Sequence, residues 1–107
     1  MEDLSSEIEK VRVPVPEGLP SELMFEYLAN CRNSLHSLKD ALERRDYEYL
    51  LVFGHRMKGC GGAYGFSELT EMGFRIERSA VHRNDRELLD HTRALEEYLT
   101  RVEIIAG

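Results

Sequence analysis

The sequence predicts an all-α protein, an antiparallel up-down four-helix bundle preceded by a short extended leader. Three observations favour this fold class. All three prolines lie before residue 21, so nothing in the remaining chain forbids long helices. Apolar residues then recur at steps of three and four, which is the spacing of one helix face. The junctions between these periodic segments are short, and short connections place successive helices antiparallel.

The leader is predicted over residues 1–19 and the bundle over residues 20–107. Within the leader, three valines alternate with an arginine and two prolines over residues 11–16. Prolines at alternate positions exclude a helix and favour an extended path. This segment either packs against the bundle or is the remnant of a linker.

Four segments of the bundle have the helical periodicity. The predicted helices span roughly residues 21–44, 46–63, 67–82 and 85–104. The first has an apolar seam that runs from Met24 to Leu42 at alternating steps of four and three. Ser67 is expected to cap the third helix, and Asn84 or Asp85 the fourth. Outside the leader we see no alternating pattern that would indicate a strand.

Composition narrows the possible functions. The 107 residues have a net charge of -6, with 42% hydrophobic and 32% charged residues, as expected for one soluble globular domain. The excess of negative charge argues against nucleic acid as a partner. No apolar run approaches the roughly 18 residues that span a bilayer, and the acidic residues 1–10 do not form a secretory signal. We therefore expect a cytoplasmic monomer that does not bind a membrane.

The two cysteines, Cys31 and Cys60, form neither a disulfide framework nor a zinc site. They are expected to be reduced and to lie in the core as small apolar residues. The histidines outside the second helix, His36, His82 and His91, have no supporting residues around them, and we expect them to be exposed to solvent.

The predicted second helix is rich in glycine at Gly54, Gly59, Gly61 and Gly62. Each glycine costs about 0.5–1 kcal/mol relative to alanine in a helix interior. A helix with several glycines is expected where a neighbouring helix or a partner molecule approaches its backbone closely. Gly54 and Gly61 lie on the apolar face and are predicted to pack against a neighbouring helix. The other two glycines do not lie on that face.

At about 100° per residue, Gly59 and Gly62 share one stripe with His55, Lys58 and Leu51, turned away from the apolar face. This predicts a solvent-side surface with an imidazole, a cation, an exposed leucine and two positions without side chains. Bare backbone beside the histidine lets a large partner reach the ring. Metal binding is not favoured, because the residues one turn from the histidine are not ligands. A Ser-His-Asp site is not favoured either, since no nucleophile elbow is present.

The segment that begins at His55 resembles the signature of histidine-containing phosphotransfer (HPt) domains, H-x-x-K-G with further glycines downstream. The matching residues are His55, Lys58, Gly59, Gly62, Gly65 and Leu69. The similarity is specific over about residues 53–80, and the helical pattern over 20–104 is compatible with the bundle of this family. The short motif alone would be weak, whereas the extended pattern within a bundle of this size is strong.

The resemblance implies that His55 is phosphorylated on a ring nitrogen, usually Nε2. It would accept the phosphoryl group from a receiver aspartate or a histidine kinase and pass it to another receiver aspartate. Lys58 would offer a cation to the phosphoryl oxygens, and Gly59 and Gly62 would clear space for the receiver. Glu77 matches a position where some family members place Glu or Gln against the active ring, where it would accept the Nδ1 proton.

The expected partners are response-regulator receiver domains and a histidine kinase or hybrid kinase, with Leu51 as a docking contact. Such a carrier has no ATP site, and the sequence contains no nucleotide-binding glycine loop. The chain is therefore expected to be no enzyme and to need no cofactor of its own, with Mg²⁺ supplied by the receiver. Its origin as a free-standing protein or a domain of a larger kinase stays open.

Two alternatives belong to other classes. One is the dimerisation and phosphoacceptor domain of a sensor or chemotaxis-type kinase. In a sensor kinase domain an acidic residue usually follows the histidine and a proline lies a few positions on, whereas here Arg56 follows and no proline occurs. The other is a helical interaction module without the chemistry, which the intact His55 and Lys58 disfavour. Arg56 and Arg75 are equally compatible with a partner contact and with a solvated surface.

Overall fold

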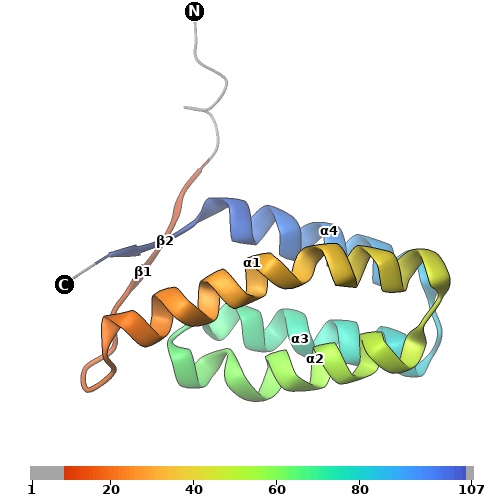
Figure 1. The fold of residues 1–107 in the computed structure, drawn as a ribbon, viewed down its shortest axis with the longest axis horizontal. Coiled ribbons are helices and arrows are strands. Elements are labelled where there is room, and N and C mark those ends of the chain that lie inside the picture. The colour runs from red at the N-terminus through yellow and green to blue at the C-terminus, as the bar shows by residue number, and fades with distance from the viewer. Residues whose placement is uncertain (1–8, 106–107) are drawn as a thin grey trace, which may run out of the picture.

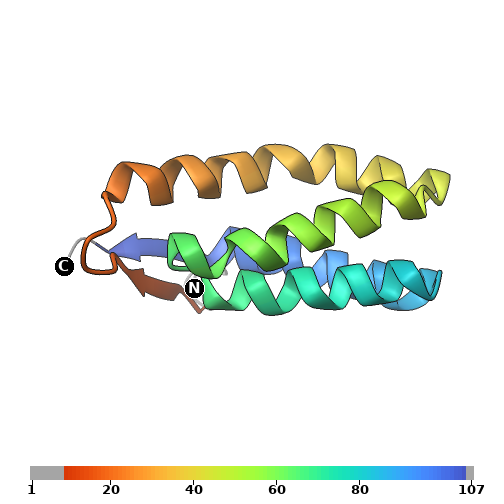
Figure 2. The ribbon, with the colours of Figure 1, turned by 90° about the horizontal axis from the view of Figure 1, so that it is seen from below.

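Four helices make up most of the computed structural model, which describes residues 9–105. They are α1 (Ser21–Arg44), α2 (Tyr47–Cys60), α3 (Ser67–Val81) and α4 (Asp85–Arg101). The helices lie side by side with their long axes aligned, as two views show (Figures 1 and 2). The all-α class is confirmed, and the first helix has the predicted bounds. Most of the acidic N-terminal stretch lies outside the described residues. No helix within 9–105 is both long and apolar enough to cross a membrane.

The core lies along the shared inner faces of the helices. The residues spaced by three and four along each helix are those that lose contact with solvent, as the hydrophobic effect requires. The buried apolar residues are Met24, Leu28, Cys31, Leu38, Ala41, Leu50, Met57, Phe66, Leu69, Ile76, Ala80, Leu88, Leu95, Tyr98, Leu99 and Val102. Every helix contributes to this cluster, so each is anchored on the others.

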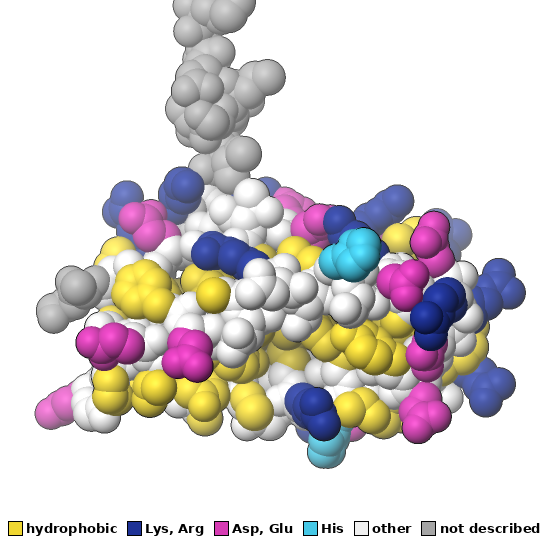
Figure 3. Space-filling model, in the orientation of Figure 1, with side chains coloured by type: hydrophobic (Ala, Val, Ile, Leu, Met, Phe, Trp, Pro, Cys, Tyr) yellow, Lys and Arg dark blue, Asp and Glu magenta, His cyan; other side chains and the backbone are white. Residues whose placement is uncertain are grey.

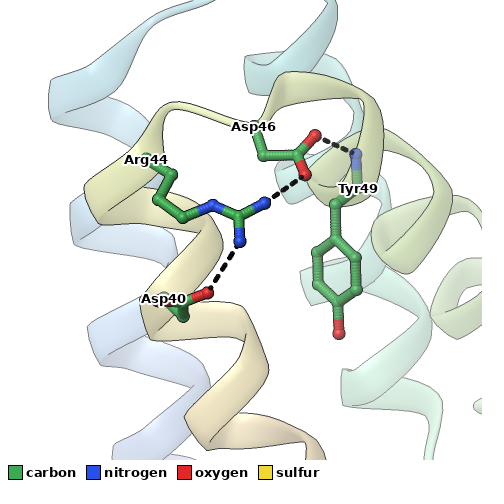
Figure 4. A network of polar contacts seen from close by, with 4 residues as sticks. All are labelled: Asp40, Arg44, Asp46 and Tyr49. Carbon is green, nitrogen blue, oxygen red and sulfur yellow. Dashed lines mark hydrogen bonds and ion pairs between the residues drawn. The ribbon is translucent and has the colours of Figure 1, made fainter.

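A two-residue turn joins α1 to α2 and is fixed by polar contacts. Arg45 adopts a left-handed conformation with φ 53°, which ends α1. Asp46 then caps α2, because its carboxylate accepts a hydrogen bond from the backbone N–H of Tyr49 at 3.1 Å. Arg44 donates to both Asp40 and Asp46, each at 3.3 Å (Figure 4). The turn therefore sets where α2 begins relative to α1.

The connection from α2 to α3 differs from the prediction. α2 ends at Cys60, and a short 3₁₀ helix, η2 (Gly62–Tyr64), follows in place of a further helical turn. Gly65 has φ 89°, a left-handed conformation that favours glycine. The prediction that Ser67 caps α3 is wrong, since the buried Phe66 occupies that position and its carbonyl accepts the first helical hydrogen bond.

At the opposite end of the third helix, the predicted N-cap of the fourth helix is confirmed. The side chain of Asn84 accepts a hydrogen bond from the backbone N–H of Glu87 at 3.1 Å. Asn84 is therefore the cap, and Asp85 is the first helical residue.

The leader is part of a small sheet that the sequence did not predict. β1 (Val11–Pro14) pairs in parallel with β2 (Val102–Ile105), with Val11 opposite Val102. The expected fourth helix is therefore three residues too long, and the expectation of no strand outside the leader is wrong. Only four residues form β2, and their apolar spacing continues that of α4. Arg32 donates hydrogen bonds to the carbonyls of Leu99 and Val102 where the helix ends.

Candidate functional site: His55, Lys58 and Glu77 on α2 and α3

Glycines bring the backbones of α2 and α3 into direct contact. A Cβ atom on Gly54 would lie 2.5 Å from the backbone nitrogen of Glu77, and one on Gly61 would lie 2.7 Å from that of Thr70. No real Cβ approaches so closely, so the packing role predicted for both glycines is confirmed. Gly73 faces them from α3, where a Cβ would lie 2.7 Å from the carbonyl oxygen of Gly54.

Gly73 was missed in the sequence, although its spacing could have revealed it. It lies four residues after Leu69 and three before Ile76, so it continues the buried face of α3. Met72, one residue earlier in the chain, is only partly buried. The glycine contact sets the separation between α2 and α3. It thereby also sets the distance between a side chain on α2 and a side chain on α3 that point to the same side of the helix pair.

Three of the predicted side chains meet on that side. His55 and Lys58 are one turn apart on α2, and Glu77 reaches both from α3. The Nδ1 atom of His55 lies 2.7 Å from Oε2 of Glu77, and Nζ of Lys58 donates to Oε1 of Glu77 at 2.7 Å. The His55 side chain is 65% exposed, whereas that of Glu77 is 17% exposed. The Glu77 carboxylate is therefore the more buried part of the site, and the His55 ring is the part that is exposed to solvent.

The charge of Glu77 is favoured by its partners. The hydrogen bond from Lys58 is the main cause that holds the pKa of Glu77 below its ordinary value of 4.5. Burial opposes this effect, and the contact with His55 lowers the pKa further. An ionised carboxylate is an acceptor only. It therefore favours the imidazole tautomer with its proton on Nδ1, which leaves the lone pair of Nε2 free to act as a nucleophile.

The residues predicted to border the histidine differ in their placement. Gly59 has open space, because no atom outside its own stretch of α2 lies within 4 Å of where its Cβ would be. Gly62 is exposed but lies in η2, so its placement on the α2 stripe is wrong; its N–H donates to the Thr70 hydroxyl at 2.7 Å. Leu51 is not the exposed leucine that was expected. It is half-buried and packs against the core.

Two exposed apolar side chains near the site were not predicted. Val52 precedes His55 by one turn on α2, and Phe74 precedes Glu77 by one turn on α3; their exposed fractions are 40% and 41%. Helical spacing would have found both, since each is three residues before a residue of the cluster. Arg56 is exposed beside the histidine, and Arg75 pairs with Glu71 on α3.

The other histidines and the two cysteines agree only in part with the predictions. His36 and His82 are exposed as expected, but His91 is half-buried. Cys31 is buried in the core, whereas Cys60 is exposed because it lies at the very end of α2, so the expectation of two core cysteines is half wrong. Within residues 9–105, no group of three or more His, Cys, Asp or Glu side chains is arranged to hold a metal ion.

Comparison with protein families agrees with this geometry. The model of the Hpt domain matches residues 22–104, a range that includes nearly all of the four helices and the whole His55 cluster. Comparison with curated proteins and with solved structures finds no match. Hpt domains are phosphocarrier modules of phosphorelays, which interact with receiver domains and kinases. Since the match covers well over half of its length, the chain belongs to the Hpt domain family.

Proposed function

We propose that the chain is a phosphoryl carrier that receives a phosphoryl group on Nε2 of His55 from a receiver aspartate or a histidine kinase and passes it to another receiver aspartate. The observation that supports this most directly is the contact of Nδ1 with Glu77. It gives the two ring nitrogens different tasks, because one is occupied by the carboxylate and the other is left for an incoming group. The large exposure of the ring is consistent with a partner as large as a protein domain.

The proposed transfer conserves atoms and charge. The lone pair of Nε2 attacks phosphorus while the bond between phosphorus and the aspartyl oxygen breaks, and the aspartate leaves as a carboxylate. The ring then has a proton on Nδ1 and a phosphoryl group on Nε2, so it bears positive charge. The ionised Glu77 would stabilise that charge at a distance of 2.7 Å. The reverse reaction would return the phosphoryl group along the same path.

Lys58 would neutralise charge on the phosphoryl oxygens. An ammonium group has three N–H donors, so its hydrogen bond to Glu77 leaves two for other acceptors. Glu77 would thus hold the ammonium group close to the reacting nitrogen. The bare position at Gly59 would admit the receiver, which would also supply Mg²⁺.

The up-down, antiparallel order of the helices is part of the same proposal. The short turn between α1 and α2 and the stacking of Tyr27 on Tyr64 support it. We also propose that the chain is a cytoplasmic monomer without catalytic activity of its own, because it would act through partners that supply both the phosphoryl group and the metal.

Phosphotransfer to a His55→Gln variant tests the proposal. The purified chain is incubated with phosphorylated receivers, and label transfer is measured for the parent, for His55→Gln and for the matched control His36→Gln, which removes an exposed histidine on α1. We expect the parent and the control to be labelled equally and His55→Gln to stay unlabelled but folded, because the lost ring leaves no core cavity. Labelling of His55→Gln at the parent level would refute the assignment. An acid-stable adduct would indicate a phosphoester rather than phosphohistidine.

A further inference from the structure

The two cysteines line the same groove between α1 and α2. The groove has a volume of about 350 Å³ and also contains Tyr27, Phe53 and Arg56 among its lining residues. Figure 3 shows hydrophobic side chains along the boundary between these two helices. Cys31 lies at the buried side of this groove and Cys60 at its exposed side, and both are free thiols. Nothing in the proposed phosphotransfer uses either thiol.

The turn between the helices sets the two cysteines at the same level. Cys31 lies fourteen residues before the turn at 45–46, and Cys60 lies fourteen residues after it. Tyr27 and Tyr64 are each eighteen residues from the same turn, and their rings stack with centroids 4.7 Å apart and planes at 10°. The cysteines have the same symmetry about the turn as this stacked pair, and both line the groove next to it.

The two thiols differ in their access to solvent. Burial raises the pKa of the Cys31 thiol, so its reactive thiolate is disfavoured. Cys60 is exposed and lies one turn after Arg56, whose guanidinium places a positive charge on the same groove. A small oxidant from solution would therefore meet Cys60 first, while Cys31 is reached only across the groove.

We propose that Cys31 and Cys60 are a peroxide-sensitive pair that closes into an intramolecular disulfide. Hydrogen peroxide oxidises the thiol of Cys60 to a sulfenic acid and is itself reduced to water. The sulfur of Cys31 then attacks the sulfenic sulfur, the S–S bond forms, and the hydroxyl leaves with the Cys31 proton as a second water.

Closure requires α1 and α2 to approach each other, because the Cα atoms of a disulfide are at most about 6.8 Å apart. The boundary between these helices is an open groove, unlike the glycine contact between α2 and α3. Cys60 is also the last residue of α2, where the chain passes into η2. Formation of the disulfide therefore requires the groove to narrow next to the end of α2.

The test uses the full chain and does not depend on phosphotransfer. The reduced protein is treated with limiting hydrogen peroxide, and its intact mass, its peptides and its thermal unfolding are measured without reductant. We expect a monomer that has lost the mass of two hydrogen atoms, a peptide that links Cys31 to Cys60, and a higher unfolding midpoint that returns to its starting value with dithiothreitol.

Two variants distinguish a disulfide-forming pair of cysteines from a single reactive cysteine. Cys31→Ala should stop at a sulfenic acid on Cys60 that dimedone traps, and Cys60→Ser should stay unoxidised at the same dose; circular dichroism establishes that both are folded. Three results would overturn the proposal. The first is a disulfide that joins two chains through Cys60 alone. The second is formation of sulfinic acid on Cys60 at the same rate in the parent as in Cys31→Ala. The third is a parent protein that peroxide does not modify.

Discussion

Alanine at two glycines of α2 should change stability in opposite directions. At Gly59 a Cβ meets open space, so Gly59→Ala should stabilise the protein by about 0.5–1 kcal/mol through helix propensity alone. At Gly54 the same atom would lie 2.5 Å from the Glu77 nitrogen, so α2 and α3 must move apart by roughly 0.9 Å to reach an ordinary contact of 3.4 Å. Overpacking of this kind typically costs about 1–3 kcal/mol. Gly54→Ala should therefore be destabilising despite its better helix propensity.

The same displacement should reach the functional cluster. If the helices separate by roughly 0.9 Å, the contact between His55 Nδ1 and Glu77 Oε2 lengthens from 2.7 Å to roughly 3.6 Å, beyond the range of a hydrogen bond. Urea unfolding gives the stabilities, and the tautomer of His55 can be followed by ¹⁵N NMR of the ring. We expect Gly54→Ala to lose the preference for the Nδ1–H tautomer and Gly59→Ala to keep it. Equal stability of the two variants would refute the glycine-contact argument.

Two further predictions concern the partners of His55. The pKa of Glu77 lies below 4.5 in the folded state, so ionised Glu77 stabilises the fold above the ordinary carboxyl pKa, and this contribution is lost as the pH falls through the lowered pKa. Urea unfolding should therefore show Glu77→Gln less stable than the parent at pH 7 and the difference vanishing in acid; a difference independent of pH would contradict this. Lys58→Ala should slow single-turnover transfer at low salt and still yield phosphohistidine, with the deficit shrinking as salt rises. If Lys58→Ala transferred at the parent's rate at low salt, Lys58 would have no electrostatic role in the transfer.

Local sequence patterns predicted most of the bundle because each helix has its own apolar face and its own ends. The bounds of α1 and the cap at Asn84 follow from residues that lie next to each other in the chain. The pairing of β1 with β2 could not be predicted in this way. Val11 and Val102 are neighbours only once the bundle has formed, and a segment of four residues has no periodicity that distinguishes a strand from a further helical turn.

The candidate site was predictable in its residues but not in its geometry. The spacing of His55, Lys58 and Gly59 on one helix is readable from the sequence, whereas Glu77 entered only through a family resemblance. Its contact with both side chains depends on the distance between two helices, which Gly54 and Gly73 set together. The prediction of an exposed Leu51 was wrong because angles around α2 alone do not show how the rest of the bundle packs against that helix.

Glycine thus serves two different purposes on α2, although its cost to helix stability is the same in both. At Gly54 the missing side chain is used within the fold, where the backbone of α3 occupies the space. At Gly59 the space is empty in the isolated chain, so folding gains nothing from the glycine. A residue that weakens its helix without improving the packing is better explained by a need outside the monomer. If Gly59→Gln stays folded and is phosphorylated as fast as the parent, that explanation fails. If its transfer rate falls while its stability rises, the empty space is reserved for the receiver.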